Sequence, residues 1–241
     1  MDSVPAHWHR MRRTVHDVLR TRCILLRFIP PELIDIILEL AEYWACVMSN
    51  RSTQMLVKAS TETEPTSEQN IYLQSARVPR GSRVRRVTFR VRSCDQGKSN
   101  NAKCRGTYKG TSSWFEVGVV EAPQELVASN SEPDLTSNQS HSRRWFLQSN
   151  IHGARYRKLH EVVWSVYDQV TDPASTLDES DGAVKNAPNP DPNRLTTGSG
   201  SGRGFLENLH PGSSISLYAQ AKYPGWENHV FSAEIEMECF L

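Results

Sequence analysis

Short segments in which apolar and polar residues alternate are the feature that most restricts the fold of this 241-residue chain. In the segment 84–92, Val87, Phe89 and Val91 alternate with arginine and threonine, which places the apolar side chains on one face of an extended strand. Other plausible strands lie at 53–58, 71–76, 114–120, 144–150, 161–167, 215–221 and 231–239. About eight strands without intervening helices predict a mainly β chain, folded as an antiparallel, jelly-roll-like β-sandwich.

The N-terminal part has a helical period instead. A loose helical pattern at 14–23 precedes a clearer one, in which Pro31 suits the first turn of a helix. Apolar residues then recur at the spacing of one helix face, namely Leu33, Ile36, Ile37, Leu40, Ala41 and Trp44. After Trp44 the period changes to two. The predicted organisation is therefore an N-terminal helical segment at 1–48, followed by a β-sandwich domain at 52–241.

Two segments interrupt the predicted sandwich. Residues 122–142 and 171–204 are rich in Ser, Asn, Asp, Pro and Gly and poor in large apolar residues. Such segments bury too little apolar surface to offset the entropy of ordering, so both are predicted to be flexible insertions. The glycine-rich stretch 198–204 is predicted to be a flexible tether.

Composition excludes several classes of function. The 28 basic and 27 acidic residues nearly cancel, so the charge as a whole predicts neither a nucleic-acid partner nor a membrane surface. Five scattered cysteines without a CxxC pair predict reduced thiols and no structural metal, and no residue pattern indicates a cofactor. The first residues lack the pattern of a secretory signal, so the expected location is the cytoplasm or nucleus.

The sequence Pro30-Pro31-Glu32-Leu33-Ile34-Asp35-Ile36-Ile37-Leu38-Glu39-Leu40 resembles the first helix of an F-box, with Ile29 where the motif usually opens on leucine. The resemblance covers about a dozen residues. It implies that the apolar face of this helix, Leu33, Ile36, Ile37, Leu40 and Trp44, docks a Skp-type adaptor of a cullin ubiquitin ligase. The alternative is that the same face covers one end or face of the sandwich.

Wider stretches of the chain resemble a group of largely uncharacterised fungal proteins. The segments that carry this resemblance are 31–33, 41–44, 92–97, 106–108, 113–117, 145–150 and 223–230, in this order. The resemblance implies a shared sandwich, and no activity comes with it.

Two predicted turns supply a candidate binding site. Asp95 and Gln96 follow one strong strand, while Trp226 and Asn228 lie in a turn before another. If the two turns share one end of the sandwich, they offer a carboxylate, amides and an aromatic platform to a protein or glycan partner. The alternative is that Asp95 and Asn228 cap turns and Trp226 closes the rim of the core.

The arginines of segment 77–92 are dense enough to suggest phosphate contacts, but Glu234, Glu236 and Glu238 lie on the polar face of the last strand. Pairing of these charges across the sheet is the favoured interpretation. No nucleophile–base spacing or carboxylate pair stands out, so the chain is not predicted to be an enzyme. The leading hypothesis is a binding or adaptor module; the alternatives are a truncated F-box-type substrate receptor and a structural domain with no ligand site.

Overall fold

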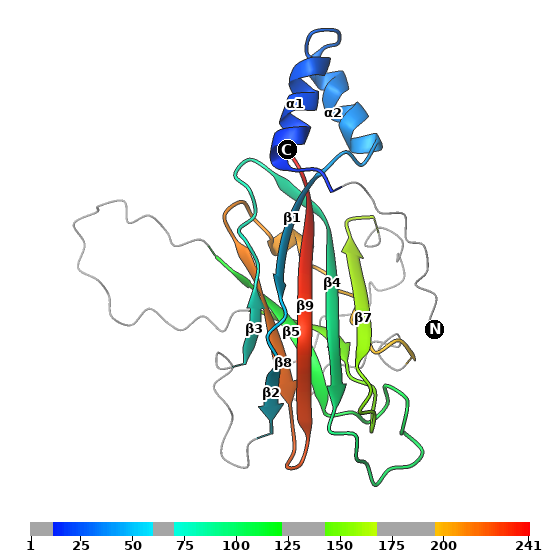
Figure 1. Cartoon of the computed structure of the whole chain (residues 1–241). Coiled ribbons are helices and arrows are strands. Elements are labelled where there is room, and N and C mark those ends of the chain that lie inside the picture. The colour runs from blue at the N-terminus through cyan, green and yellow to red at the C-terminus, as the bar shows by residue number, and fades with distance from the viewer. Residues whose placement is uncertain (1–11, 60–69, 122–142, 168–195) are drawn as a thin grey trace, which may run out of the picture.

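The chain folds into two antiparallel β-sheets with a pair of helices at one end (Figure 1). This computed structural model describes residues 12–59, 70–121, 143–167 and 196–241. The predicted class, a mainly β antiparallel sandwich with a small N-terminal helical segment, is confirmed. The first predicted insertion, 122–142, and residues 171–195 of the second lie outside the described residues.

The first sheet is built around the last strand of the chain. Its order is β1 (Ala45–Arg51), β9 (Glu227–Phe240), β4 (Arg83–Asp95) and β7 (Lys158–Ser165), and β2 (Met55–Lys58) also pairs with β9. β1 pairs with the C-terminal part of β9, whereas β2 pairs with its first residues. The second sheet has the order β3 (Ile71–Gln74), β8 (Ser214–Ala221), β5 (Ser113–Val120) and β6 (Arg144–Ser149).

The core lies between the two sheets and follows the predicted alternation. Phe89 of β4, Phe115 of β5 and Ile235 of β9 are fully buried. Phe205, just before the 3-10 helix η1 (Leu206–Asn208), packs edge-on against Trp164 with ring centroids 4.9 Å apart. Burial of such aromatic and branched side chains is the main stabilising contribution to a two-layer fold.

Charges pair across the outer face of the first sheet, as the sequence predicts. Arg90 of β4 lies opposite Glu234 of β9 and bonds it at 2.6 Å, and also contacts Glu236 at 2.7 Å and Glu161 at 2.7 Å. Arg86 contacts Glu238 at 2.9 Å. These arginines are therefore engaged by carboxylates of neighbouring strands.

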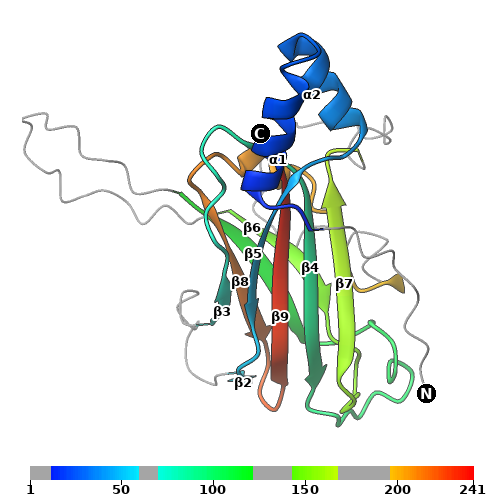
Figure 2. The ribbon, with the colours of Figure 1, turned by 45° about the horizontal axis from the view of Figure 1, so that its top comes forward.

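The helices α1 (Val15–Leu25) and α2 (Pro31–Leu40) form a hairpin that extends beyond the sandwich, next to the C-terminus (Figures 1 and 2). Thr14 and Asp17 form a capping box that begins α1. Arg22 of α1 contacts Asp35 of α2 at 2.8 Å and donates to the carbonyl of Leu241 at 3.0 Å. These contacts join the two helices to each other and attach the hairpin to the sandwich.

Two sequence-based predictions about this end are corrected. Trp44 does not belong to α2, because the helix ends at Leu40; Trp44 is 2% exposed and its ring lies under the Arg86 guanidinium, 5.2 Å away. The predicted boundary between the helical segment (1–48) and the sandwich domain (52–241) is also wrong. It falls inside β1, whose first residues had been assigned to the helical segment. β1 alternates only weakly in sequence because several of its side chains are half-buried.

The glycine-rich stretch is also corrected where it is described. Residues 198–204 are packed against β6 of the second sheet and β7 of the first instead of forming a flexible tether. The amide of Gly200 donates to Leu147 at 2.9 Å, and the Trp164 indole donates to the Gly200 carbonyl at 3.0 Å. A side chain at Gly200 would meet the Phe146 carbonyl. Glycine is required here for close backbone approach, which composition alone confuses with flexibility.

Candidate functional site

One end of the sandwich, opposite the helical hairpin, is made of loops. Residues 96–112 leave β4, residues 150–157 join β6 to β7, and residues 222–226 join β8 to β9 (Figure 1). This surface is called the loop end. The two turns that the sequence singles out, around residues 95 and 226, meet here: the amide of Glu227 donates to the Gln96 side chain at 3.4 Å.

Asp95 holds the loops in place from inside the protein. The residue is fully buried, and its carboxylate accepts hydrogen bonds from the amides of Gly97 at 2.7 Å and Gly153 at 2.5 Å. Burial raises the pKa of this carboxyl group, and the backbone donors oppose that shift. Its oxygens therefore accept bonds from two loops. This arrangement agrees with the alternative in which Asp95 caps turns instead of contacting a ligand.

Asn228 is likewise buried and bridges the two sheets. Its amide donates to the carbonyls of Trp114 at 3.0 Å and Gln220 at 3.1 Å, both in the second sheet. Its oxygen accepts from Asn150 at 2.9 Å, and Asn150 in turn accepts from Ser93 at 2.6 Å. A closed polar network of this kind fixes one arrangement of the strands beneath the loops.

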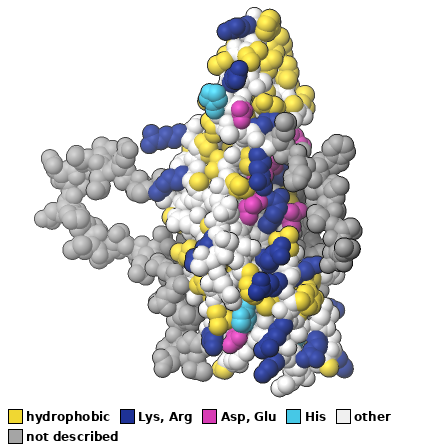
Figure 3. Space-filling view, viewed as in Figure 1, with side chains coloured by type: hydrophobic (Ala, Val, Ile, Leu, Met, Phe, Trp, Pro, Cys, Tyr) yellow, Lys and Arg dark blue, Asp and Glu magenta, His cyan; other side chains and the backbone are white. Residues whose placement is uncertain are grey.

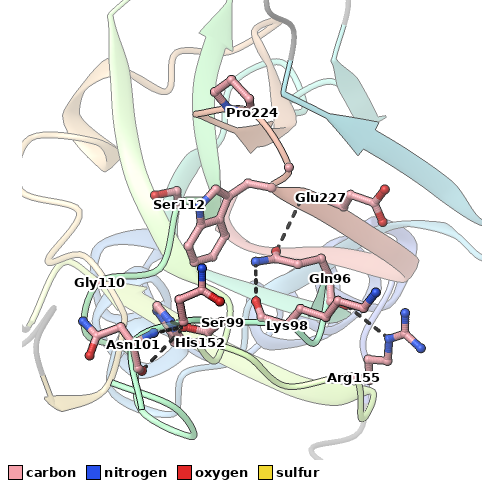
Figure 4. Close-up of a pocket in the computed structure, with 13 residues that line it drawn as sticks. Gln96, Lys98, Ser99, Asn101, Gly110, Ser112, His152, Arg155, Pro224 and Glu227 are labelled. Atoms are coloured by element: carbon pink, nitrogen blue, oxygen red, sulfur yellow. Dashed lines mark hydrogen bonds between the residues drawn. The ribbon is translucent and has the colours of Figure 1, made fainter. Parts of the chain in front are cut away.

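The other two predicted ligand residues, Gln96 and Trp226, line an open hollow of about 670 Å³ at the loop end (Figure 4). The same hollow is lined by Lys98, Ser99, Asn101, His152 and Arg155. Trp226 is half-buried, which leaves part of its indole facing the hollow. The structure therefore divides the four predicted ligand residues into a buried pair that supports the loops and an accessible pair that lines the hollow.

His152 is the residue that the sequence analysis missed. It is 3% exposed and lies below Trp226, with ring centroids 5.2 Å apart at an interplanar angle of 79°. Its Nε2 forms a hydrogen bond with the Ser99 hydroxyl, whereas its Nδ1 has no hydrogen-bond partner among the described residues. A side chain added at Gly110, which lines the hollow, would lie 3.7 Å from Nδ1. The available signal was its position just after the segment 144–150, at the strand end that antiparallel pairing brings to the loop end.

The other candidate surface is the helical hairpin. Among the predicted docking residues, Leu33 is 49%, Ile36 54%, Ile37 45% and Leu40 80% exposed. Ile34 and Leu38, on the other side of α2, are buried. Figure 3 shows hydrophobic side chains gathered over the hairpin, and α1 and the following turn contribute the exposed Leu19, Ile24, Leu26 and Phe28. We call the exposed set Leu33, Ile36, Ile37 and Leu40 the α2 face.

Within the described ranges no group of three or more His, Cys, Asp or Glu residues is placed to hold a metal ion. Nor does the described part of the chain contain a helix long and apolar enough to cross a membrane.

Comparison with family models, with curated proteins and with solved structures finds no match to this chain.

Proposed function

We propose that the protein is a non-enzymatic binding module whose ligand site is the hollow at the loop end. The observation that carries this proposal is the pairing of a half-buried Trp226 with the buried His152 beneath it, whose Nδ1 has no partner among the described residues. A buried polar atom without a partner costs about 1–3 kcal/mol. A ligand that bonds this nitrogen would relieve that cost, and the indole face would supply apolar contact.

The Ser99–His152 pair supports binding better than catalysis. In nucleophilic catalysis a third group usually holds the imidazole by its other nitrogen, so that the histidine accepts the serine proton in the correct orientation. No carboxylate of the described residues contacts Nδ1 of His152. The Ser99 hydroxyl also accepts a bond from the amide of Asn101 at 3.0 Å, as expected of a residue that shapes its loop.

The test is binding to defined panels of oligosaccharides and short peptides, with the indole N–H of Trp226 followed by NMR. We expect at least one panel member to shift this signal. Trp226→Leu should weaken that binding at least tenfold. Tyr223→Asn is the control, because Tyr223 is exposed in the same turn, has a positive φ that asparagine tolerates, and does not line the hollow. The proposal would be overturned if no member of either panel shifted the Trp226 signal, or if Trp226→Leu bound the ligand as tightly as the native chain.

A second function is favoured by the exposure of the α2 face. We propose that this face docks a protein partner, for which the F-box-like sequence of α2 suggests a Skp-type adaptor in the cytoplasm or nucleus. Helix α2 extends beyond the sandwich (Figure 2), and Ile34 and Leu38 are its buried residues, so the α2 face is left exposed. Exposed apolar residues gathered on one element are typical of an interaction site.

A purified Skp-type adaptor tests this second proposal. We expect it to bind the full chain, and Ile37→Asp to abolish binding while the protein stays folded. Tyr223→Asp is the matched control, because it places the same charge on an exposed apolar residue at the loop end. If the adaptor does not bind, or binds the Ile37→Asp variant equally well, the adaptor proposal fails while the ligand site at the loop end is unaffected.

A further inference from the structure

The loops at the loop end of the sandwich carry basic side chains and no acidic ones. Residues 96–112 and 150–158 contain no aspartate or glutamate. They carry the basic residues Lys98, Lys103, Arg105, Lys109, Arg155, Arg157 and Lys158, here called the loop cations. Two of these, Lys98 and Arg155, line the hollow itself. The nearly neutral total charge of the chain therefore conceals a local excess of positive charge at the loop end.

The loop cations differ in their partners from the β4 arginines Arg86 and Arg90, here called the sheet arginines. Arg90 is shared by three carboxylates, whereas none of the loop cations forms an ion pair with a carboxylate in the described part of the chain. Arg155 donates its Nε to the Gln96 carbonyl at 3.2 Å, and Arg157 lies over the Phe231 ring at 4.1 Å. Neither contact neutralises the positive charge of the arginine, because a carbonyl group and an aromatic ring carry no net charge.

One acidic residue, Glu227, lines the hollow itself, and Asp95 directly precedes the lining residue Gln96; both carboxylates are already engaged. Asp95 is buried and bonded to loop amides. Glu227 contacts His229 at 2.9 Å and Lys58 at 3.4 Å, and the bond to His229 leads the interactions that lower its pKa. Positive potential at the loop end therefore remains available to attract an anion from solution.

The remaining lining groups indicate what kind of anion fits. The hollow presents the amides of Gln96 and Asn101, the hydroxyls of Ser99 and Ser112, and the indole of Trp226 (Figure 4). None of the described lining residues is Leu, Ile, Val, Met or Phe. Peptide sites usually need apolar pockets or a free strand edge, whereas amides and hydroxyls beside one flat ring suit a molecule with hydroxyl groups and a flat apolar face.

We propose that the hollow binds an acidic saccharide, in which the sugar ring lies against Trp226 and a carboxylate or sulfate group pairs with Lys98 and Arg155. This inference rests on the proposed function of the loop end and names its ligand class. The unpartnered Nδ1 of His152 bonds a sugar hydroxyl, since either tautomer of imidazole finds a partner in a hydroxyl group. The outer loop cations raise the rate of encounter and make affinity depend on salt.

The experiment uses the full chain and calorimetric titration with defined probes. The acidic probes are a galacturonic acid hexasaccharide and a heparin hexasaccharide. The matched neutral probe is the methyl ester of the galacturonic acid hexasaccharide. A hexaglutamate peptide and inorganic sulfate are the remaining arms. We expect at least one acidic saccharide to bind tenfold or more tightly than the neutral ester, the peptide and sulfate, and its affinity to fall several-fold between low and physiological salt.

Charge removal locates the binding. The double variant Lys98→Gln with Arg155→Gln should weaken the acidic saccharide at least tenfold and leave the neutral ester unchanged. The control is Arg80→Gln, which removes an exposed charge at the hairpin end of the sandwich. Equal binding of the acidic and neutral probes through Trp226 would overturn the acidic class while preserving the binding module. Tighter binding of the peptide, or acidic binding untouched by the double variant, would overturn the inference. Failure of every probe to bind would overturn the acidic-saccharide inference, whereas the proposed binding function is decided by its own panels of oligosaccharides and peptides.

Discussion

The two ends of the sandwich expose opposite chemistries on one scaffold. At the hairpin end, apolar side chains face solvent and several of the charges beside them are paired, as in the contact of Arg85 with Glu39 at 3.0 Å. At the loop end, the groups that line the hollow are mostly polar, and the loop cations lack carboxylate partners among the described residues. The difference shows that neither exposure nor charge alone identifies a binding surface. What distinguishes each end is the kind of group that the fold leaves without a partner: apolar area at one, positive charge and an imidazole nitrogen at the other.

The largest expected effect separates the two sides of α2. Ile34→Asp would bury an unpaired carboxylate, because Ile34 is fully buried, and we expect a loss of about 4 kcal/mol in the free energy of unfolding or failure to fold. Ile37→Asp places the same charge on a half-exposed position three residues away and should cost about 0.5 kcal/mol or less. Denaturant unfolding measures both. Equal losses would show that the α2 face is core, and the contrast between the two ends would fail.

A smaller effect should appear as acid sensitivity of the loop end. His160 of β7 is buried against Tyr108, and burial lowers its pKa from 6.5 to about 4, with a further contribution from Lys158. The unfolded chain therefore binds a proton that the folded chain does not, so stability is lost as the pH falls from about 6.5 towards 4. A shift of this size corresponds to about 3 kcal/mol.

His160→Gln removes the titrating group and should flatten the stability profile between pH 6.5 and 4, even if it lowers stability at pH 7. The measurement is denaturant unfolding across that pH range. His210→Gln is the control, since His210 is exposed and lies before β8 at the other end of the sandwich. An unchanged slope in His160→Gln would show that another group dominates acid unfolding.

The buried network beneath the loops gives an intermediate prediction. Asn228→Ala leaves two carbonyls and the Asn150 amide without their partner, and we expect it to lose about 2 kcal/mol of stability. Asn100→Ala, at an exposed loop position, should lose less than about 0.5 kcal/mol. Thermal unfolding compares them. If the two variants are equally stable, the loops are not held by the bridge between the sheets.

Much of the fold could be predicted from the sequence because one periodicity dominates it. Val87, Phe89 and Val91 alternate with charged and polar residues, and the resulting faces are those observed. Pairing of the arginines of β4 with the glutamates of β9 followed from the same faces, and Arg90 with Glu234 is one observed case. β1 was harder to identify because it begins directly after Trp44, and the helical spacing extends by chance to that residue.

The candidate site was only half predictable. Gln96 and Trp226 were found because turns after strong strands share one end of a sandwich, but burial of Asp95 and Asn228 depends on contacts with Gly153 and Asn150, distant in sequence. His152 was missed because an isolated histidine carries no local pattern. The side of α2 that faces solvent was also ambiguous: both Ile34 and Ile37 are isoleucines, and only their burial in the folded chain distinguishes them.

The smallest expected effect contrasts a paired charge with an unpaired one. Glu236→Lys would place a cation beside Arg90 and Arg12, which contact Glu236 at 2.7 Å and 3.4 Å, and should cost about 1 kcal/mol. Lys109→Glu, a charge reversal of the opposite sign at a loop cation without an ion-pair partner among the described residues, should change stability by a few tenths of a kcal/mol at most. Denaturant unfolding at low and high salt would show a salt-sensitive loss for Glu236→Lys alone.

Combining Arg90→Glu with Glu236→Lys tests how Arg90 is shared among Glu161, Glu234 and Glu236. A simple pair would be restored by the double reversal, but a glutamate at position 90 would also face Glu234 and Glu161, which Arg90 contacts in the native protein. We therefore expect the double variant to be more stable than the sum of the single losses predicts, by about 0.5 kcal/mol, and still less stable than the native chain. Full recovery would mean that Arg90 serves Glu236 alone. Strict additivity would mean that the two charges do not interact, and the sheet arginines would then resemble the loop cations in being free for a ligand.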